Sequence, residues 1–191
     1  MRIHRLATVA IVTTLALGGI AGCAATPSGP SAPAASSSAG TATDGTVLPV
    51  DANPITNAST APGLSVTYAA VEDNVDPATG GALNDQLELT IRNDSASAAT
   101  GLEVFYTMTD ATTGQSESYY QDLGGLTIDA GTETTIYFDN GTGTGHYPEN
   151  RFSLYRSSTN QVDFTIEVSA TDLAPAVATA TKGVGTGEVA D

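Results

Sequence analysis

The sequence predicts an all-β domain of the sandwich type, preceded by a long unstructured tether. Two observations carry this prediction. Apolar residues in the central part of the 191-residue chain recur at every second position, which is the period of half-buried strands. Residues typical of turns separate these alternating segments, and no segment has the period of a helix. Short alternating strands at this spacing favour two packed antiparallel sheets.

The chain begins with a leader of the secretory type. Arg2 and Arg5 precede an uncharged, mostly apolar run from Leu6 to Ile20. This run is shorter than the stretch of about 20 apolar residues that spans a membrane, and it has the length of a signal-peptide core. Two small residues and the only cysteine of the chain, Cys23, follow it. We therefore expect residues 1–22 to be a signal peptide.

The end of this leader, Ile20-Ala21-Gly22-Cys23, resembles the lipobox of bacterial lipoproteins. The resemblance implies recognition by a signal peptidase through the three residues before the cysteine, cleavage after Gly22, and attachment of a diacylglycerol to the Cys23 thiol. Paired acyl chains hold a protein stably on a bilayer, so we expect it at the extracytoplasmic face of the cell membrane. The alternative is a buried free cysteine. A single cysteine excludes a disulfide within the chain.

Residues 23–62 read as a disordered linker. They contain no aromatic residue and six of the nine prolines, among Ala, Ser, Thr and Gly. Such a segment has too little apolar surface to offset the entropy lost on ordering. The alternatives are an ordered N-terminal subdomain, or a first strand at residues 47–50.

The folded domain is predicted over residues 63–174, because every aromatic residue lies between Tyr68 and Phe164. The tail, residues 175–191, should be flexible. About seven strands are expected, over residues 64–71, 86–93, 100–110, 115–121, 132–138, 152–156 and 162–171. Five of these strands have a predicted inward row: Leu64, Val66 and Tyr68; Leu87, Leu89 and Ile91; Leu102, Val104, Tyr106 and Met108; Thr134, Ile136 and Phe138; and Val162, Phe164, Ile166 and Val168.

Two segments resemble known protein families. LELTIRNDSASAATGLEVFYTMTDATTGQ (residues 87–115) is similar to immunoglobulin-like domains of bacterial surface proteins. GHYPENRFSLYRSSTNQVDFTIEVSATDLAP (residues 145–175) resembles the C-terminal half of secreted or lipid-anchored actinobacterial proteins that have no assigned activity. The resemblance implies an immunoglobulin-like sandwich at the cell surface. The chain has no tryptophan and no cysteine in the domain, so the likeness concerns the architecture and not antibody domains.

The negative net charge of the chain restricts the classes of molecule that it can bind. The formal net charge is −15, and it becomes −17 once cleavage removes Arg2 and Arg5, because all 21 acidic residues follow Cys23. Nucleic acids and anionic bilayers would be repelled. A basic partner or a cation would be attracted.

The sequence offers few candidate catalytic or metal-binding residues. The mature chain has one histidine, His146, with Ser153, Ser157 and Ser158 near it in sequence and no Gly-x-Ser-x-Gly motif, so a hydrolase is the least favoured interpretation. Asp73, Asp76 and Asp85 form an oxygen-rich loop that suits Ca²⁺, although ordinary turn chemistry explains the same residues.

Strand parity suggests a recognition surface. Phe105, Tyr119, Tyr137 and Tyr155 alternate with inward residues and would form an exposed aromatic patch if they shared one sheet face. The alternative is that a loop or the second sheet covers them. We therefore predict a non-enzymatic, lipid-anchored module that binds a cell-surface protein or envelope component through this patch or the loop around His146. A calcium-stabilised surface module is the second hypothesis.

Overall fold

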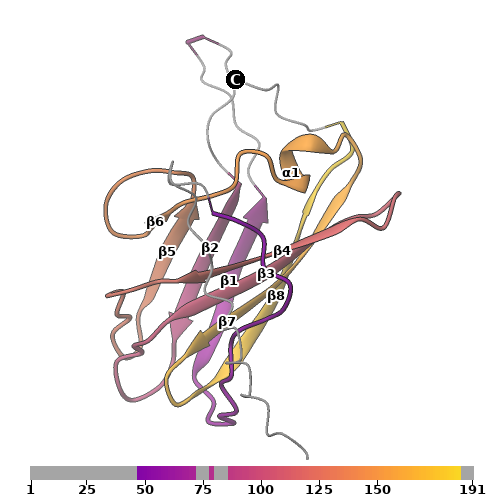
Figure 1. Cartoon of the computed structure of the whole chain (residues 1–191). Helices are drawn as coiled ribbons and strands as arrows, with labels where there is room; N and C mark the ends of the chain where they lie inside the picture. The colour runs from indigo at the N-terminus through magenta and orange to yellow at the C-terminus, as the bar shows by residue number, and fades with distance from the viewer. Residues whose placement is uncertain (1–46, 72–77, 80–85, 186–191) are drawn as a thin grey trace, which may run out of the picture. The chain divides into compact units, whose positions relative to one another are not determined.

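A computed structural model describes residues 47–71, 78–79 and 86–185. They form two packed four-stranded sheets, so the predicted β-sandwich is confirmed (Figure 1). In spatial order, the first sheet contains β1 (Leu64–Val71), β2 (Leu87–Asn93), β5 (Glu133–Phe138) and β6 (His146–Tyr147). The second contains β4 (Ser116–Asp122), β3 (Glu103–Asp110), β7 (Val162–Ala170) and β8 (Leu173–Lys182).

The strand order is that of a two-sheet sandwich whose chain crosses between the sheets. Strands β1, β2 and β5 share one sheet, while β3 crosses to the other sheet and pairs with both β4 and β7. All these pairs are antiparallel; the short β6 runs parallel to β5. Strand β1 also contacts β8, so the two sheets meet along one edge of the sandwich.

The alternating pattern fills the core as predicted. Leu87, Leu89 and Ile91 on β2 are fully buried in one hydrophobic cluster with the inward row of β7 and with Tyr106 on β3. The Tyr106 ring contacts three other rings at centroid distances of 5.3 to 6.2 Å, those of Tyr119, Phe138 and Phe164. Burial of several large rings in one cluster supplies much of the apolar stabilisation of a domain of this size.

One predicted boundary and one predicted strand near the C-terminus differ from the structure. The expected flexible tail begins inside β8, whose small residues Ala176 and Ala180 are buried beside β7. The expected strand at residues 152–156 is instead a single helical turn, α1 (Leu154–Ser157). The carboxylate of Glu117 accepts a hydrogen bond from the Leu154 backbone N–H at 2.9 Å, which satisfies an amide that the short helix leaves unpaired.

Residues 47–63, called the N-terminal strap below, lie along the second sheet. The Val50 N–H donates to the Ser118 carbonyl on β4, and the Asn53 amide donates to Glu167 on β7 at 3.0 Å. Further along, the Asn57 side-chain amide donates to the Ser169 hydroxyl and to the carbonyls of Ala170 and Leu173, at 2.8 to 3.0 Å. A disordered tether up to residue 62 is therefore wrong for the described part; the strap uses a surface built by other strands.

Candidate functional site

The outer side of the first sheet carries a row of four polar or aromatic side chains across three strands. Glu88 on β2 is the cross-strand partner of Tyr137 on β5, which in turn is the partner of His146 on β6. The Tyr137 and His146 rings stack, with centroids 5.4 Å apart and planes 20° apart. Asp139, two residues after Tyr137, contacts His146 Nδ1 through Oδ2 at 2.7 Å. The row therefore reads carboxylate, phenol, imidazole, carboxylate.

The loop between β5 and β6 fixes the position of His146. The Gly145 carbonyl accepts a hydrogen bond from the Tyr137 N–H at 2.7 Å, which aligns β6 with β5. Gly145 has a φ of +88°, a conformation that residues with a Cβ rarely adopt. At the other end of the loop, the Gly141 N–H donates to Asp139 Oδ1 at 2.8 Å. The Gly-rich stretch thus forms a turn that holds the imidazole beside the tyrosine.

Two further rows complete this surface. In the middle row, Tyr68 is the partner of Thr90, whose hydroxyl bonds that of Thr135 at 2.9 Å. In the next row, Arg92 lies 2.6 Å from Asp94 and 3.9 Å from Glu133. We call the three rows together the tyrosine face; its members are Ser65, Tyr68, Glu88, Thr90, Arg92, Glu133, Thr135, Tyr137, Asp139 and His146.

The predicted aromatic patch is only partly correct. Tyr137 lies on the tyrosine face and contacts His146, as the binding hypothesis needs. Tyr119 and Tyr155 are each only 1% exposed and belong to the core, and Phe105 lies on the other sheet. Tyr119 faces inward because it is the direct partner of inward-facing Tyr106. Tyr155 is buried because its segment is helical, so strand parity does not apply.

Sequence reasoning missed Tyr68. The alternation of Leu64 and Val66 assigns Tyr68 to the core, yet its side chain is 52% exposed. The pairing of β1 with β2 shifts register between Val66 and Tyr68, which is a β-bulge. One extra residue in a strand turns the residues after it to the opposite face. Ala69 and Val71, which follow the bulge, are partly buried and pack against the core. Their apolar character is the only signal in the sequence that the inward face changes after Val66.

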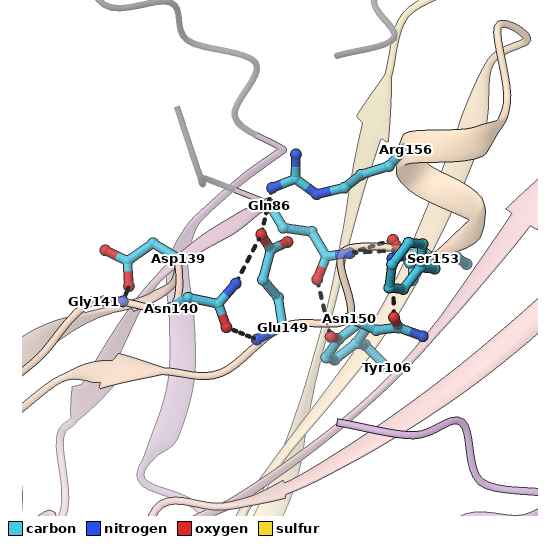
Figure 2. A network of polar contacts seen from close by, with 11 residues as sticks. Gln86, Tyr106, Asp139, Asn140, Gly141, Glu149, Asn150, Ser153 and Arg156 are labelled. Atoms are coloured by element: carbon cyan, nitrogen blue, oxygen red, sulfur yellow. Dashed lines mark hydrogen bonds and ion pairs between the residues drawn. The ribbon is translucent and has the colours of Figure 1, made fainter. Parts of the chain in front are cut away.

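A second polar cluster is buried at the end of the sandwich near α1 (Figure 2). The Glu149 carboxylate accepts hydrogen bonds from the Arg156 guanidinium and from the Asn140 side-chain amide. The Glu149 side chain is completely buried, and that of Arg156 is 11% exposed. The Asn140 side-chain oxygen in turn accepts the Glu149 N–H at 3.0 Å. This ion pair therefore joins the β5–β6 loop to the helix.

The same region contains a neutral network inside the core. Tyr106 donates its hydroxyl hydrogen to Gln86 Oε1 at 3.1 Å, and Gln86 Nε2 donates to the Ser153 hydroxyl at 3.0 Å (Figure 2). Burial, with the nearby Tyr119, raises the pKa of Tyr106 well above its ordinary value. The phenol therefore stays neutral and acts as a donor. Each of these buried groups therefore has a hydrogen-bond partner inside the core, as is usual for buried polar atoms.

Asp110 joins the end of β3 to the segment after α1. Its buried carboxylate accepts hydrogen bonds from the Ser158 hydroxyl at 2.6 Å and from the Asn160 amide at 3.0 Å. The N–H groups of Thr113 and Thr112 donate to the same carboxylate. These bonds, led by that from Ser158, hold the pKa of Asp110 well below its usual range.

Replacing Asp110 with asparagine should lower the melting temperature by several degrees at neutral pH. The pKa of the folded state is depressed, so Asp110 stabilises the fold above the unfolded pKa of about 4 and loses this effect as the pH falls. The difference between the two proteins should therefore shrink steadily below about pH 4. Thermal unfolding followed by circular dichroism from acid to neutral pH measures it; a difference that does not change with pH would contradict the assignment.

Among the described residues, no hydrogen bond joins the His146 ring to Ser153, Ser157 or Ser158. The Ser153 hydroxyl bonds Gln86 and the Ser158 hydroxyl bonds Asp110, whereas the His146 ring contacts Asp139 and Tyr137. Ser157 lies in α1. The hydroxyls of Ser153 and Ser158 are therefore engaged elsewhere, and the His146–Asp139 pair belongs to the tyrosine face.

The predicted calcium ligands Asp73, Asp76 and Asp85 lie outside the described residues, as do Cys23 and the three residues before it. Within residues 47–71, 78–79 and 86–185, no three His, Cys, Asp or Glu side chains come together in a way that could hold a metal ion. The helical part of the described chain has neither the length nor the apolar content to cross a membrane.

Comparison of the chain with models of protein families and with curated proteins finds no match.

Proposed function

We propose that the protein is a lipid-anchored, extracytoplasmic binding module without enzymatic activity, and that the tyrosine face is its binding surface. The anchor rests on the leader and on Cys23. The acyl chains would carry the attachment to the membrane, because a chain of this negative charge gains nothing from an anionic bilayer. The folded domain would then be free to present a surface to a partner in the envelope.

The observation that carries the binding proposal is the difference between the two sheet faces. The second sheet holds the protein's own N-terminal strap through Ser118, Glu167 and Ser169. The first sheet presents Tyr68, Tyr137 and His146 on its outer side, with Tyr68 half exposed. Tyrosine rings combine a large contact area with a polar tip, and they are enriched at protein recognition surfaces.

Site-specific photocross-linking in intact cells tests the binding surface. p-Benzoylphenylalanine at Tyr68 should give a discrete cross-linked product on irradiation, because this position lies within the proposed interface. The same residue at Val177, which is 68% exposed on β8 of the other sheet, is the matched control and should give none. Equal products from both positions, or none from Tyr68, would count against the tyrosine face.

The anchor has its own test. Cys23→Ala should move the protein from the membrane fraction to the soluble fraction, and the wild-type protein should carry the mass of a diacylglycerol on its first residue. A wild-type protein that lacks acyl mass, or a variant that stays membrane-bound, would contradict lipid anchoring without affecting the cross-linking result.

A further inference from the structure

We infer that the partner engaged by the tyrosine face is a cationic protein segment, and that an arginine side chain of this segment binds between Tyr137 and Glu88. This inference rests on the proposed function and specifies the chemistry of the partner. It follows from the balance of charge, from the geometry of the Glu88–Tyr137–His146 row and from the chemistry of the groups in that row.

The charge favours a cationic partner. The whole chain has a net charge of −15, so a basic molecule is attracted over a distance and an acidic one is repelled. On the tyrosine face itself, the only strongly basic side chain is Arg92, and it is already paired with Asp94 and Glu133. Among the described residues no ion pair joins Glu88 to a basic group of this chain. A basic group from outside would complement this carboxylate.

The geometry places an aromatic ring beside that carboxylate. Strand β5 lies between β2 and β6 in the sheet. His146 on β6 stacks on one side of the Tyr137 ring, so the opposite side of the ring is directed toward β2. Glu88 on β2 is the direct cross-strand partner of Tyr137, and such partners have Cβ atoms about 5 Å apart. The ring and the carboxylate are therefore neighbours.

The chemistry of this pair favours arginine over lysine. A guanidinium group is planar, stacks on a tyrosine ring, and at the same time donates two parallel hydrogen bonds to a carboxylate. A cation over an aromatic ring at an exposed site contributes about 0.5–1 kcal/mol, which corresponds to about a two- to fivefold change in affinity. An ammonium group is more strongly hydrated and lacks the planar fork, so it gains less from both contacts.

The partner is inferred to be a protein and not a sugar polymer because of the carboxylates. A neutral polysaccharide gains affinity from the rings and hydroxyls of the face, but it does not neutralise Glu88 or Asp139. Binding of a sugar polymer would then depend on Tyr68 and Tyr137 and would be nearly independent of salt. Binding of a cationic segment depends on Glu88 and weakens as salt rises, since these charges are close to the surface.

The test uses the full-length chain carrying Cys23→Ser, so that no acyl group contributes, and an octa-arginine peptide as the probe. Isothermal titration calorimetry should detect binding that weakens with salt. Glu88→Gln and Tyr137→Leu should each reduce the affinity about two- to fivefold. Tyr137→Phe, which keeps the ring, should have little effect. An octalysine peptide should bind more weakly than the octa-arginine peptide.

The control separates specific binding from general attraction to an acidic protein. Asp163→Asn removes one negative charge from an exposed position on β7, in the other sheet, and should leave the affinity unchanged within error. If Glu88→Gln and Asp163→Asn weaken binding equally, or if the octa-arginine peptide does not bind, the inference is wrong. A neutral oligosaccharide that binds instead, with loss on Tyr137→Leu only, also overturns it. In each case a cross-link formed from position 68 would leave the proposed binding surface intact.

Discussion

Replacing Arg156 with leucine should lower the free energy of unfolding by about 3–5 kcal/mol. The Glu149 carboxylate that pairs with it is completely buried, and Arg156 is itself only 11% exposed. Removing one member of a buried pair leaves the other charge without its counter-ion in a poorly hydrated site, and this loss is much larger than the net contribution of the pair. Urea unfolding of the full-length chain, followed by circular dichroism, measures the change.

A double variant distinguishes the ion pair from simple loss of packing. In Glu149→Gln combined with Arg156→Leu, neither charge of this pair remains, and the glutamine can still accept the hydrogen bond from Asn140. The double variant should therefore be clearly more stable than Arg156→Leu alone. A double variant that is as unstable as the sum of its two single variants would show that the charges do not interact energetically.

The sheets were predictable because their sequence obeys one simple rule. Along β2 and β7, apolar and polar residues alternate without interruption, and the buried row is the predicted row in both strands. Strand β8 escaped prediction because its inward residues include alanines, whose small apolar area gives a weak periodic signal. This strand is specified by its neighbours: β7 pairs with it and β1 contacts it across the edge. Tertiary pairing decides the conformation of such a segment.

The candidate site was predicted correctly where it depends on regular strand alternation and incorrectly where it depends on loops, bulges or tertiary pairing. Tyr137 follows strand parity, and sequence reasoning placed it on an outer face. His146 contacts Tyr137 because the loop ending at Gly145 brings the short β6 parallel to β5. The sequence of this loop has no periodic pattern from which the pairing could be predicted. Tyr68 was assigned to the wrong side by one bulge, and Tyr155 by one helical turn. A bulge of one residue and a helical turn of four residues thus determine on which side these two tyrosines lie.

Replacing Tyr106 with alanine should lower the free energy of unfolding by about 3–5 kcal/mol. The ring is 2% exposed and contacts the rings of Tyr119, Phe138 and Phe164, so its removal leaves a large cavity where the two sheets meet. Tyr106→Phe keeps the ring and removes only the hydroxyl. This change should cost about 1–3 kcal/mol, because Gln86 Oε1 loses its hydrogen-bond donor inside the core.

Chemical denaturation of the two variants, together with Gln86→Leu and the double variant Tyr106→Phe/Gln86→Leu, separates ring packing from hydrogen bonding. If the hydroxyl acts through Gln86, Tyr106→Phe should cost much less in the Gln86→Leu background than in the wild type, since the unsatisfied oxygen is then absent. Equal costs in the two backgrounds would mean that the hydroxyl contributes through packing alone. The buried amide would then not be the reason that a tyrosine, and not a phenylalanine, occupies the centre of this core.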